Sequence, residues 1–241
     1  MNEFNTIAII EGDALIREIL PRWFGDAPGF RCGNLYADVR TARGRLPAAR
    51  PDLVLADLAL PGAIECVREL KPLLPATRFV TWSVYEDAEW AFAALAAGAV
   101  GCLSKSLRRT DLIAALAAAC RGVLPMTSAV ARKVLLHFSC VLTERNRVME
   151  LNAHERTVLE FLARGYRCEE VSAALGVGVS IVEAHLRGVC AKLQARSQLG
   201  MSAPGNSASS ADPLADKTRQ TARGFLSIKG FGGSRTVTIA G

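Results

Sequence analysis

The chain has 241 residues, half of them hydrophobic, and a formal net charge of +6. This length suits one large domain or two ordinary ones, each able to bury its own core. No run of about 18 uncharged apolar residues is present, so no membrane helix is predicted. The first ten residues lack a basic region and a cleavage site, so no signal peptide is predicted either. Seven scattered cysteines without a C-x-x-C pair indicate reduced thiols, and we expect a cytoplasmic protein.

The positive charge is unevenly distributed along the chain. Residues 1–126 and residues 150–199 each carry equal numbers of basic and acidic groups, so the whole excess lies in residues 127–149 and 200–241. Such basic flanks either add sequence-independent attraction to nucleic acid or are simply solvated.

The first half of the chain alternates between strand-like and helix-like segments. Apolar runs predict strands at 6–10, 30–36, 53–56, 78–82 and 100–103, and helical patterns lie at 14–25, 38–47, 63–71, 87–97 and 109–121. This alternation predicts a parallel sheet that is covered on both faces. Ligands of such sheets bind outside the carboxyl ends of the strands. The residues that follow the strands are therefore the candidate site.

Four of the predicted strands are followed by candidate site residues. These are Glu11, Gly12 and Asp13 after the first strand, and Asp57, Ser83 and Lys105 after three others. A carboxylate can accept a phosphoryl group. A metal ion and a lysine can offset the charge on its oxygens, and a hydroxyl can hydrogen-bond one of them. Singly, Asp57 is also explained as a helix cap and Lys105 as a surface charge. Together at one rim, these residues predict chemistry on a phosphoryl group.

Three stretches carry a family resemblance: the opening segment, PDLVLADLALPG and FVTWSVYEDAEWAFAALAAGAVGCLSK. Over about residues 5–122 they resemble the receiver domain of bacterial two-component response regulators. The resemblance implies a flavodoxin-like α/β fold with a parallel five-stranded sheet, and Mg²⁺ as cofactor. It implies Asp57 as phosphoacceptor, Ser83 as switch hydroxyl and Lys105 as the phosphate-pairing lysine. A sensor histidine kinase or a small phosphodonor is the implied partner.

Two positions depart from the receiver pattern. The family's two adjacent acids align with Glu11 and Gly12, so one side chain that ordinarily coordinates the metal is missing. Glu11 and Asp57 remain as metal ligands; Asp13 is an alternative, although a helix N-cap explains it better. Because Mg²⁺ keeps several waters and often uses one or two carboxylates, we expect an impaired site rather than none. Cys102 replaces the family's usual aromatic, which predicts weaker switching.

Residues 123–149 predict a linker that contains one short amphipathic helix, with Thr127 and Ser128 as its caps and a flexible remainder rich in Arg and Asn. His137 in this helix is expected to be a packed or surface imidazole.

Residues 150–199 divide into three helices. Asn152 with Glu155 three positions later has the form of a capping box at the start of the first. Glycines end the first two helices, and the third, at about 179–194, has a predicted buried side made of Val182, Leu186, Val189 and Leu193. The second and third helices, joined by a short Gly-containing turn, predict a helix-turn-helix, in which the last helix enters the major groove of DNA.

The stretches ERTVLEFLARG, EEVSAALGV and VEAHLRGVCAKL resemble the LuxR-type DNA-binding domain of the NarL/FixJ subfamily. The resemblance implies double-stranded DNA as a partner. The implied DNA-binding residues are Ser180, Glu183, Arg187, Lys192 and Arg196, with ordinary solvated charge as the alternative. Glu183 replaces a family lysine; it either repels DNA or accepts a hydrogen bond from cytosine. The Gly-, Ser- and Ala-rich residues 200–241 predict a disordered tail where the family has a fourth helix, which leaves a homodimer open.

These features predict a DNA-binding transcriptional response regulator of a phosphorelay, and not an enzyme, because no base or nucleophile pair is legible beyond the phosphoacceptor site. Its predicted parts are a receiver at 1–122, a linker at 123–149, a helix-turn-helix domain at 150–199 and a tail at 200–241. The alternative is a protein-interaction module, made of a pseudo-receiver and a degenerate DNA-binding domain, which Glu183 and the missing fourth helix favour.

Overall fold

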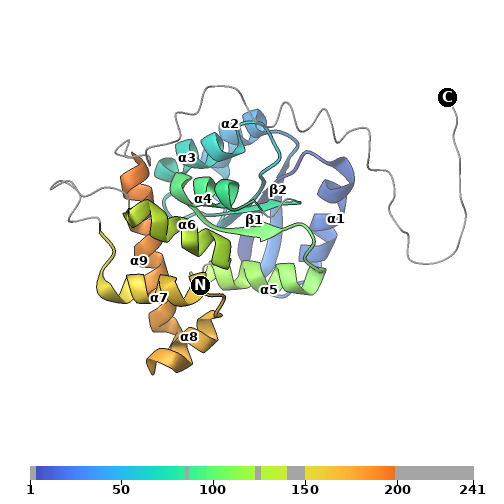
Figure 1. Cartoon of the computed structure of the whole chain (residues 1–241). Helices are drawn as coiled ribbons and strands as arrows, with labels where there is room; N and C mark the ends of the chain where they lie inside the picture. Colours follow the sequence, from blue (N-terminus) through green and yellow to red (C-terminus); the bar gives the residue numbers. More distant parts are fainter. Residues whose placement is uncertain (1–3, 85–86, 123–125, 140–149, 199–241) are drawn as a thin grey trace, which may run out of the picture. The chain divides into compact units, whose positions relative to one another are not determined.

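A computed structural model describes residues 4–84, 87–122, 126–139 and 150–198 (Figure 1). The predicted tail at 200–241 lies outside the described residues. So does the part of the predicted linker that is rich in Arg and Asn, at 140–149.

Five parallel strands form one sheet. They are β1 (Asn5–Ile10), β2 (Phe30–Tyr36), β3 (Leu53–Asp57), β4 (Arg78–Ser83) and β5 (Ala99–Ser104). Their order across the sheet is β2-β1-β3-β4-β5. This is the strand order of flavodoxin-like folds, so the predicted fold class is confirmed.

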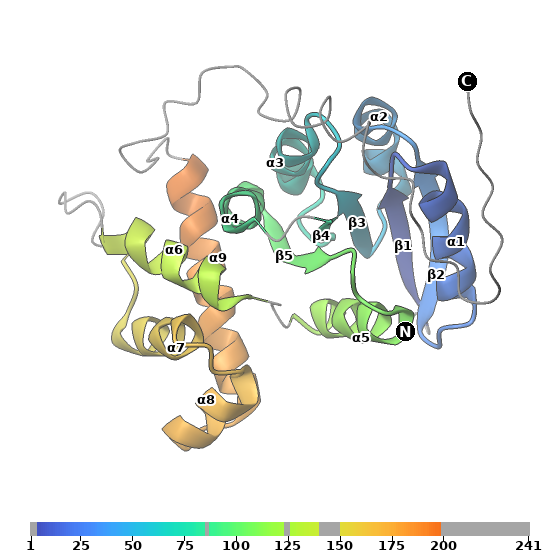
Figure 2. The same cartoon turned by 45° about the vertical axis from the view of Figure 1, so that its right-hand side comes forward.

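Five helices cover both faces of this sheet, as Figure 2 shows: α1 (Ala14–Gly25), α2 (Val39–Ala49), α3 (Ala63–Leu73), α4 (Ala88–Ala97) and α5 (Arg109–Cys120). Along β1, Ile7 and Ile9 pack with residues of α1 and α5, whereas Ala8 and Ile10 pack with residues of α2, α3 and α4. Because successive side chains of a strand point to opposite faces, strands buried on both sides read as continuous apolar runs. This is the pattern from which the strands were predicted.

The register of the strands brings their carboxyl ends together. Ile10 of β1 pairs with Ala56 of β3, so the acids Glu11 and Asp57 follow at the same level. Asp57 in turn pairs with Trp82 of β4. The strand order reverses direction between β1 and β3, and the crevice at such a switch point is where ligands of open α/β sheets bind.

Four further helices follow the sheet domain: α6 (Ser128–Ser139), α7 (Ala153–Ala163), α8 (Cys168–Leu175) and α9 (Val179–Gln198). We call residues 150–198 the reader unit. The predicted capping box is confirmed, since Asn152 Oδ1 accepts from Glu155 N at 2.8 Å and Glu155 Oε2 accepts from Asn152 N at 2.8 Å. No single helix in the described part of the chain is long and apolar enough to cross a membrane; α8 and α9 meet that test only together, as a pair bent by 112°.

One apolar cluster joins α6 to the reader unit. It contains apolar residues of three helices: Val130, Val134 and Phe138 of α6, Val158, Leu159 and Leu162 of α7, and Val182, Leu186, Val189 and Leu193 of α9. The predicted buried side of α9 is thus confirmed. Ala91 and Leu95 of α4 belong to the same cluster, which the sequence did not predict.

Candidate functional site

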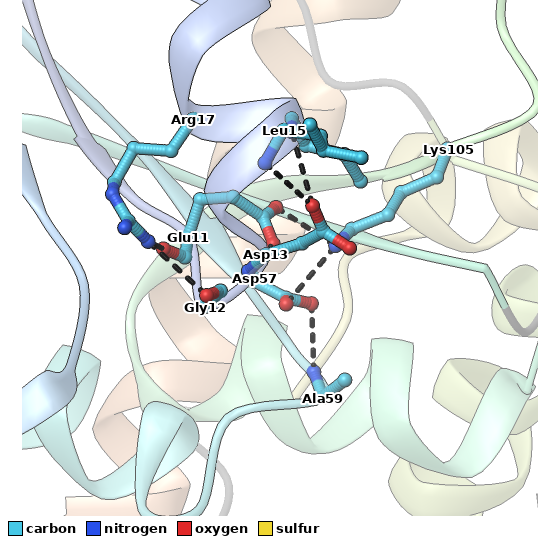
Figure 3. Close-up of polar contacts among 9 residues, drawn as sticks. Glu11, Gly12, Asp13, Leu15, Arg17, Asp57, Ala59 and Lys105 are labelled. Atoms are coloured by element: carbon cyan, nitrogen blue, oxygen red, sulfur yellow. Dashed lines mark hydrogen bonds and ion pairs between the residues drawn. The ribbon is translucent and has the colours of Figure 1, made fainter. Parts of the chain in front are cut away.

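A lysine lies between two buried carboxylates at the carboxyl edge of the sheet. Lys105 Nζ is 2.8 Å from Glu11 Oε2 and 3.0 Å from Asp57 Oδ2 (Figure 3). The Lys105 side chain is only 9% exposed, and Glu11 and Asp57 are buried. Charges removed from water need partners, and one ammonium here serves two carboxylates. The three residues come from the ends of β5, β1 and β3, as the sequence predicted.

Main-chain amides hold the second oxygen of each carboxylate. Asp57 Oδ1 accepts from Ala59 N at 2.9 Å, and Glu11 Oε1 accepts from Asp13 N at 2.9 Å. Burial raises the pKa of Glu11 and the charge of Asp57 raises it further, although the bonds from Lys105 and the Asp13 amide act in the opposite direction. Both carboxylates are therefore fixed in orientation, with one oxygen of each turned to Lys105.

Asp13 caps the helix that follows the site. Its Oδ1 accepts from Leu15 N at 2.8 Å and from Ile16 N at 3.1 Å, which confirms the predicted N-cap of α1. Among the described residues Asp13 forms no ion pair with Lys105. Its alternative role as a metal ligand therefore competes with its role in starting α1.

Gly12 lies where the receiver pattern has a second acid, and there is nearly enough room for a side chain. A Cβ atom at Gly12 would lie 2.9 Å from Leu60 Cδ2, the far end of a flexible side chain. The backbone at Gly12 does not adopt a positive φ. A Cβ atom here thus requires only that the end of the Leu60 side chain moves.

Two contacts of the site were not predicted. Arg17 Nη1 donates to the main-chain oxygens of Glu11 at 2.7 Å and of Gly12 at 3.1 Å, and so fastens the turn between β1 and α1. Helical side chains tilt towards the N-terminus of their helix, so an arginine one turn after the N-cap can reach main-chain oxygens just before the helix, and this local signal was usable. Lys105 Nζ also lies 4.9 Å from the ring centroid of Trp82, a cation–π contact that required the sheet register to foresee.

The predicted switch hydroxyl lies on the neighbouring strand. Ser83 ends β4 with 4% of its surface exposed, and its main-chain oxygen accepts from Lys105 N at 2.7 Å. Cys102, which replaces the family's aromatic, is half-buried on β5. It packs against the apolar cluster that includes residues of α3 and α4, and against the cluster that joins α6 to the reader unit. Burial raises the pKa of its thiol.

The donor set at this edge suits a hard divalent cation with few protein ligands. Glu11 and Asp57 offer carboxylate oxygens, which Mg²⁺ prefers, and it commonly uses one or two of them with water. Across the described ranges, no three His, Cys, Asp or Glu side chains gather at one point. The two carboxylates fit Mg²⁺, but the Lys105 ammonium competes with it for both.

The first turns of α9 carry three of the predicted DNA-binding residues. Ser180 and Arg187 are exposed, and Glu183 is half-buried. Arg187 Nη1 donates to the main-chain oxygen of Gly122 at 3.1 Å, after the end of α5. Glu183 forms no ion pair with Arg187 in the described structure; it lies near Cys168 of α8, where its charge adds to burial and to Glu169 in raising the pKa of the thiol.

The two basic residues nearer the end of α9 face the protein. Lys192 Nζ donates to Glu155 Oε2 at 2.6 Å and to the main-chain oxygen of Glu150 at 2.9 Å. Arg196 is 2% exposed, with Cζ 4.7 Å from the ring centroid of Phe138. In this structure Arg196 is not placed to contact DNA, because a side chain so buried cannot reach a phosphate without moving.

The comparisons with known proteins agree with this geometry. Residues 7–117 match the model of the response regulator receiver domain, and residues 149–201 match that of the luxR family of bacterial regulatory proteins. The nitrate/nitrite response regulator protein NarL of Escherichia coli (strain K12) is 30% identical over 198 residues, which cover 80% of this chain and 91% of NarL. The uncharacterized transcriptional regulatory protein YxjL of Bacillus subtilis (strain 168) is 29% identical over 153 residues, or 61% of this chain and 70% of YxjL.

Among solved structures, a two-component response regulator of the LuxR family from Aurantimonas sp. SI85-9A1 covers 54% of this chain and 94% of its own, with 27% identity and a TM-score of 0.49. The chain belongs to the NarL family of two-component response regulators, which join a receiver to a LuxR-type helix-turn-helix that binds DNA.

Proposed function

We propose that this protein regulates transcription by binding double-stranded DNA through α8 and α9, under the control of a receiver that is phosphorylated on Asp57. A sensor histidine kinase or a small phosphodonor supplies the phosphoryl group. The observation that carries the proposal is the Lys105 ammonium 3.0 Å from Asp57 Oδ2, beside a buried Glu11. A cation held there offsets the negative charge of a phosphoryl group on Asp57.

The residues of the site have distinct proposed roles. Asp57 Oδ2 attacks phosphorus and keeps the phosphoryl group, while the leaving group departs with the bonding electrons. Ala59 N holds Oδ1 in place. Lys105 pairs with the phosphoryl oxygens. The hydroxyl of Ser83 is the switch, because it moves to hydrogen-bond one of these oxygens. The side chain of Cys102 is smaller than the aromatic side chain usual in the family, so the conformational change that follows phosphorylation is smaller.

Mg²⁺ is the proposed cofactor, and Glu11 and Asp57 are the residues that would hold it. When bound, the ion neutralises charge on the phosphoryl oxygens. With glycine at position 12, the site offers one carboxylate fewer than the receiver pattern, so we propose that Mg²⁺ binds weakly and that phosphorylation is slow.

Intact mass spectrometry tests the receiver. Acetyl phosphate with Mg²⁺ should add the mass of one phosphoryl group to the full-length protein, and Asp57→Asn should remove that addition. An equal gain in mass in the Asp57→Asn variant would contradict the assignment of Asp57. If the wild-type protein gains no mass, the proposal that this receiver is phosphorylated is contradicted.

The proposed DNA contacts are Ser180, Glu183 and Arg187 near the start of α9, with Lys192 at the edge of the surface. Neutralising a phosphate releases counterions, so the logarithm of the association constant should fall linearly with the logarithm of salt concentration. Arg187→Ala should flatten that slope by about one phosphate contact if Arg187 binds the backbone. If it binds a guanine instead, the variant should lose sequence preference.

One observation favours the alternative, a protein-interaction module. The described contacts engage Arg187 with Gly122, Lys192 with Glu155 and Arg196 with Phe138, so the cations of α9 are used within the chain. A duplex titration across salt concentrations, with and without acetyl phosphate, separates the two functions. Salt-sensitive binding supports the DNA-binding function, and its absence in both states supports the module. Sedimentation of the bound complex shows whether one copy or two occupy the duplex.

A further inference from the structure

The exposed side of α9 carries an aliphatic side chain where the helix begins. Ile181, the third residue of α9, is 47% exposed, although its neighbour Val182 is completely buried. Its main-chain N–H donates to Gly178 O at 2.9 Å, so the first helical turn is formed there. Ala184 and Arg187 follow at intervals of three residues and are also exposed.

These three side chains form a row along one side of the helix. Three residues of an α-helix rise by about 4.5 Å, which is close to the roughly 3.4 Å between successive base pairs of one DNA strand. In a helix-turn-helix, the N-terminal residues of the second helix approach the base edges in the major groove. The row therefore presents a sec-butyl group, a methyl group and a guanidinium to neighbouring base pairs.

The chemistry of an aliphatic side chain restricts the base it can face. Guanine, adenine and cytosine present only hydrogen-bond donors and acceptors in the major groove, whereas thymine adds an exposed C5-methyl group. An isoleucine packed against a polar base edge would remove a hydrogen-bond donor or acceptor of the base from water without offering a new hydrogen bond, which is unfavourable. Against thymine it buries two apolar surfaces at once.

We infer that Ile181, with Ala184 beside it, reads the C5-methyl group of a thymine near the base pair that Arg187 contacts. This specificity residue rests on the proposed DNA-binding function. It adds an apolar element of sequence readout to the polar contacts proposed for this helix. Glu183 does not interrupt the row, since it is half-buried near Cys168.

Deoxyuridine provides the test, because it pairs as thymidine does and lacks only the C5-methyl group. Duplexes bound by the full-length protein are first selected from a random-sequence library, with and without acetyl phosphate and Mg²⁺. Each thymine of the selected site is then replaced singly by deoxyuridine. We expect at least one position at which the wild type loses affinity by about four-fold, the factor that corresponds to burial of one methyl group.

Variants of Ile181 connect that loss to the side chain. Ile181→Ala should bind the thymine and deoxyuridine duplexes nearly equally, and Ile181→Val should keep part of the difference. Both substitutions are at an exposed position, so the fold should be retained. Leu136→Ala, which trims a 64% exposed leucine on α6, is the matched control and should keep the full four-fold difference.

The outcomes are distinct. Sequence-selective binding that is equally tight for thymine and deoxyuridine at every position would overturn the role of Ile181 and leave the proposed function standing. A change in oligomeric state for Ile181→Ala without any methyl effect would assign the exposed side chain to protein contact, and would also overturn it. Failure to select any duplex in either state would refute DNA binding itself.

Discussion

A Cβ atom at Gly188 of α9 would lie 2.6 Å from Oε1 of Glu155 on α7. Glycine at this position thus makes room for a buried carboxylate that also binds Lys192 Nζ and the Asn152 amide through its other oxygen. The reader unit is held together here by a polar contact between α7 and α9, which both also contribute residues to the apolar cluster.

Gly188→Ala should therefore destabilise the protein. Alanine favours a helix by about 1 kcal/mol over glycine, but here the added methyl displaces Glu155 from Lys192, and overpacking typically costs about 1–3 kcal/mol. We expect a net loss of about 1 kcal/mol in the free energy of unfolding, measured with urea. Gly44→Ala in α2, where a Cβ would meet nothing within 4 Å, is the control and should gain stability. Equal gains in both variants would show that Glu155 yields without cost.

Gly12→Asp should restore a metal-binding carboxylate. We expect Mg²⁺ affinity to rise about ten-fold, equal to about 1.4 kcal/mol, and phosphorylation by acetyl phosphate to become faster. Repulsion among the acids should lower stability in the absence of metal. Calorimetric Mg²⁺ titration measures the first effect, and Gly25→Asp, which adds the same charge at the end of α1, controls for net charge. Unchanged Mg²⁺ affinity in Gly12→Asp would mean that Asp13 or water already serves in its place.

Glu183→Lys tests what the acid on α9 does. If Glu183 repels DNA, the variant should bind every duplex more tightly, and its salt dependence should steepen by about one to two phosphate contacts. If Glu183 accepts a hydrogen bond from cytosine, the variant should gain non-specific binding and lose preference for its selected site. Glu160→Lys on α7 makes the same charge change elsewhere in the reader unit. Weaker binding of Glu183→Lys to all duplexes would indicate that this part of α9 does not face DNA.

Because His137 is a titratable residue whose ring nitrogens are buried, we expect the stability of the protein to depend on pH. Its two ring nitrogens are buried with no partner in the described structure, and its ring lies 5.3 Å from that of Phe92 on α4. Burial, and then the charge of Arg196, lower the pKa of His137 below its ordinary value of 6.5. Between the lowered and the ordinary pKa the unfolded chain binds more protons, so stability increases with pH.

The stabilisation from neutral His137 is thus complete above about pH 6.5 and is lost as the pH falls from there towards the lowered pKa. Urea unfolding at a series of pH values should show this loss in the wild type and a flatter profile in His137→Leu. Identical pH profiles for the two proteins would show that the imidazole remains accessible to water.

The sequence predicted the sheet and the acidic edge because both depend on local patterns. Continuous apolar runs located the buried strands, and polar residues at their ends located Glu11, Asp57 and Lys105. The contact between Lys105 and Trp82 depends on how β4 and β5 meet, and neither strand alone encodes it.

The basic side chain of Arg196 predicts a contact with DNA, whereas the helical periodicity of α9 predicts a buried position. The buried positions 182, 186, 189 and 193 of α9 continue to 196 at the same helical spacing, so the pattern places Arg196 on the inner face. Helix α4 had a similar signal: apart from Glu89 in its first turn, its sequence AEWAFAALAA is apolar, and a helix of that kind is covered on more than one side.

The apolar cluster that includes Leu95 of α4, Phe138 of α6 and Leu193 of α9 has a consequence for how the protein unfolds. Elements that share one core open together, as a single cooperative unit in amide hydrogen exchange. The boundary between cooperative units thus does not follow the boundary between the two sequence families, since α4 should exchange with α9. A fragment that begins at residue 150 would lack α4 and α6, and its amides should exchange faster than the same amides in the whole chain.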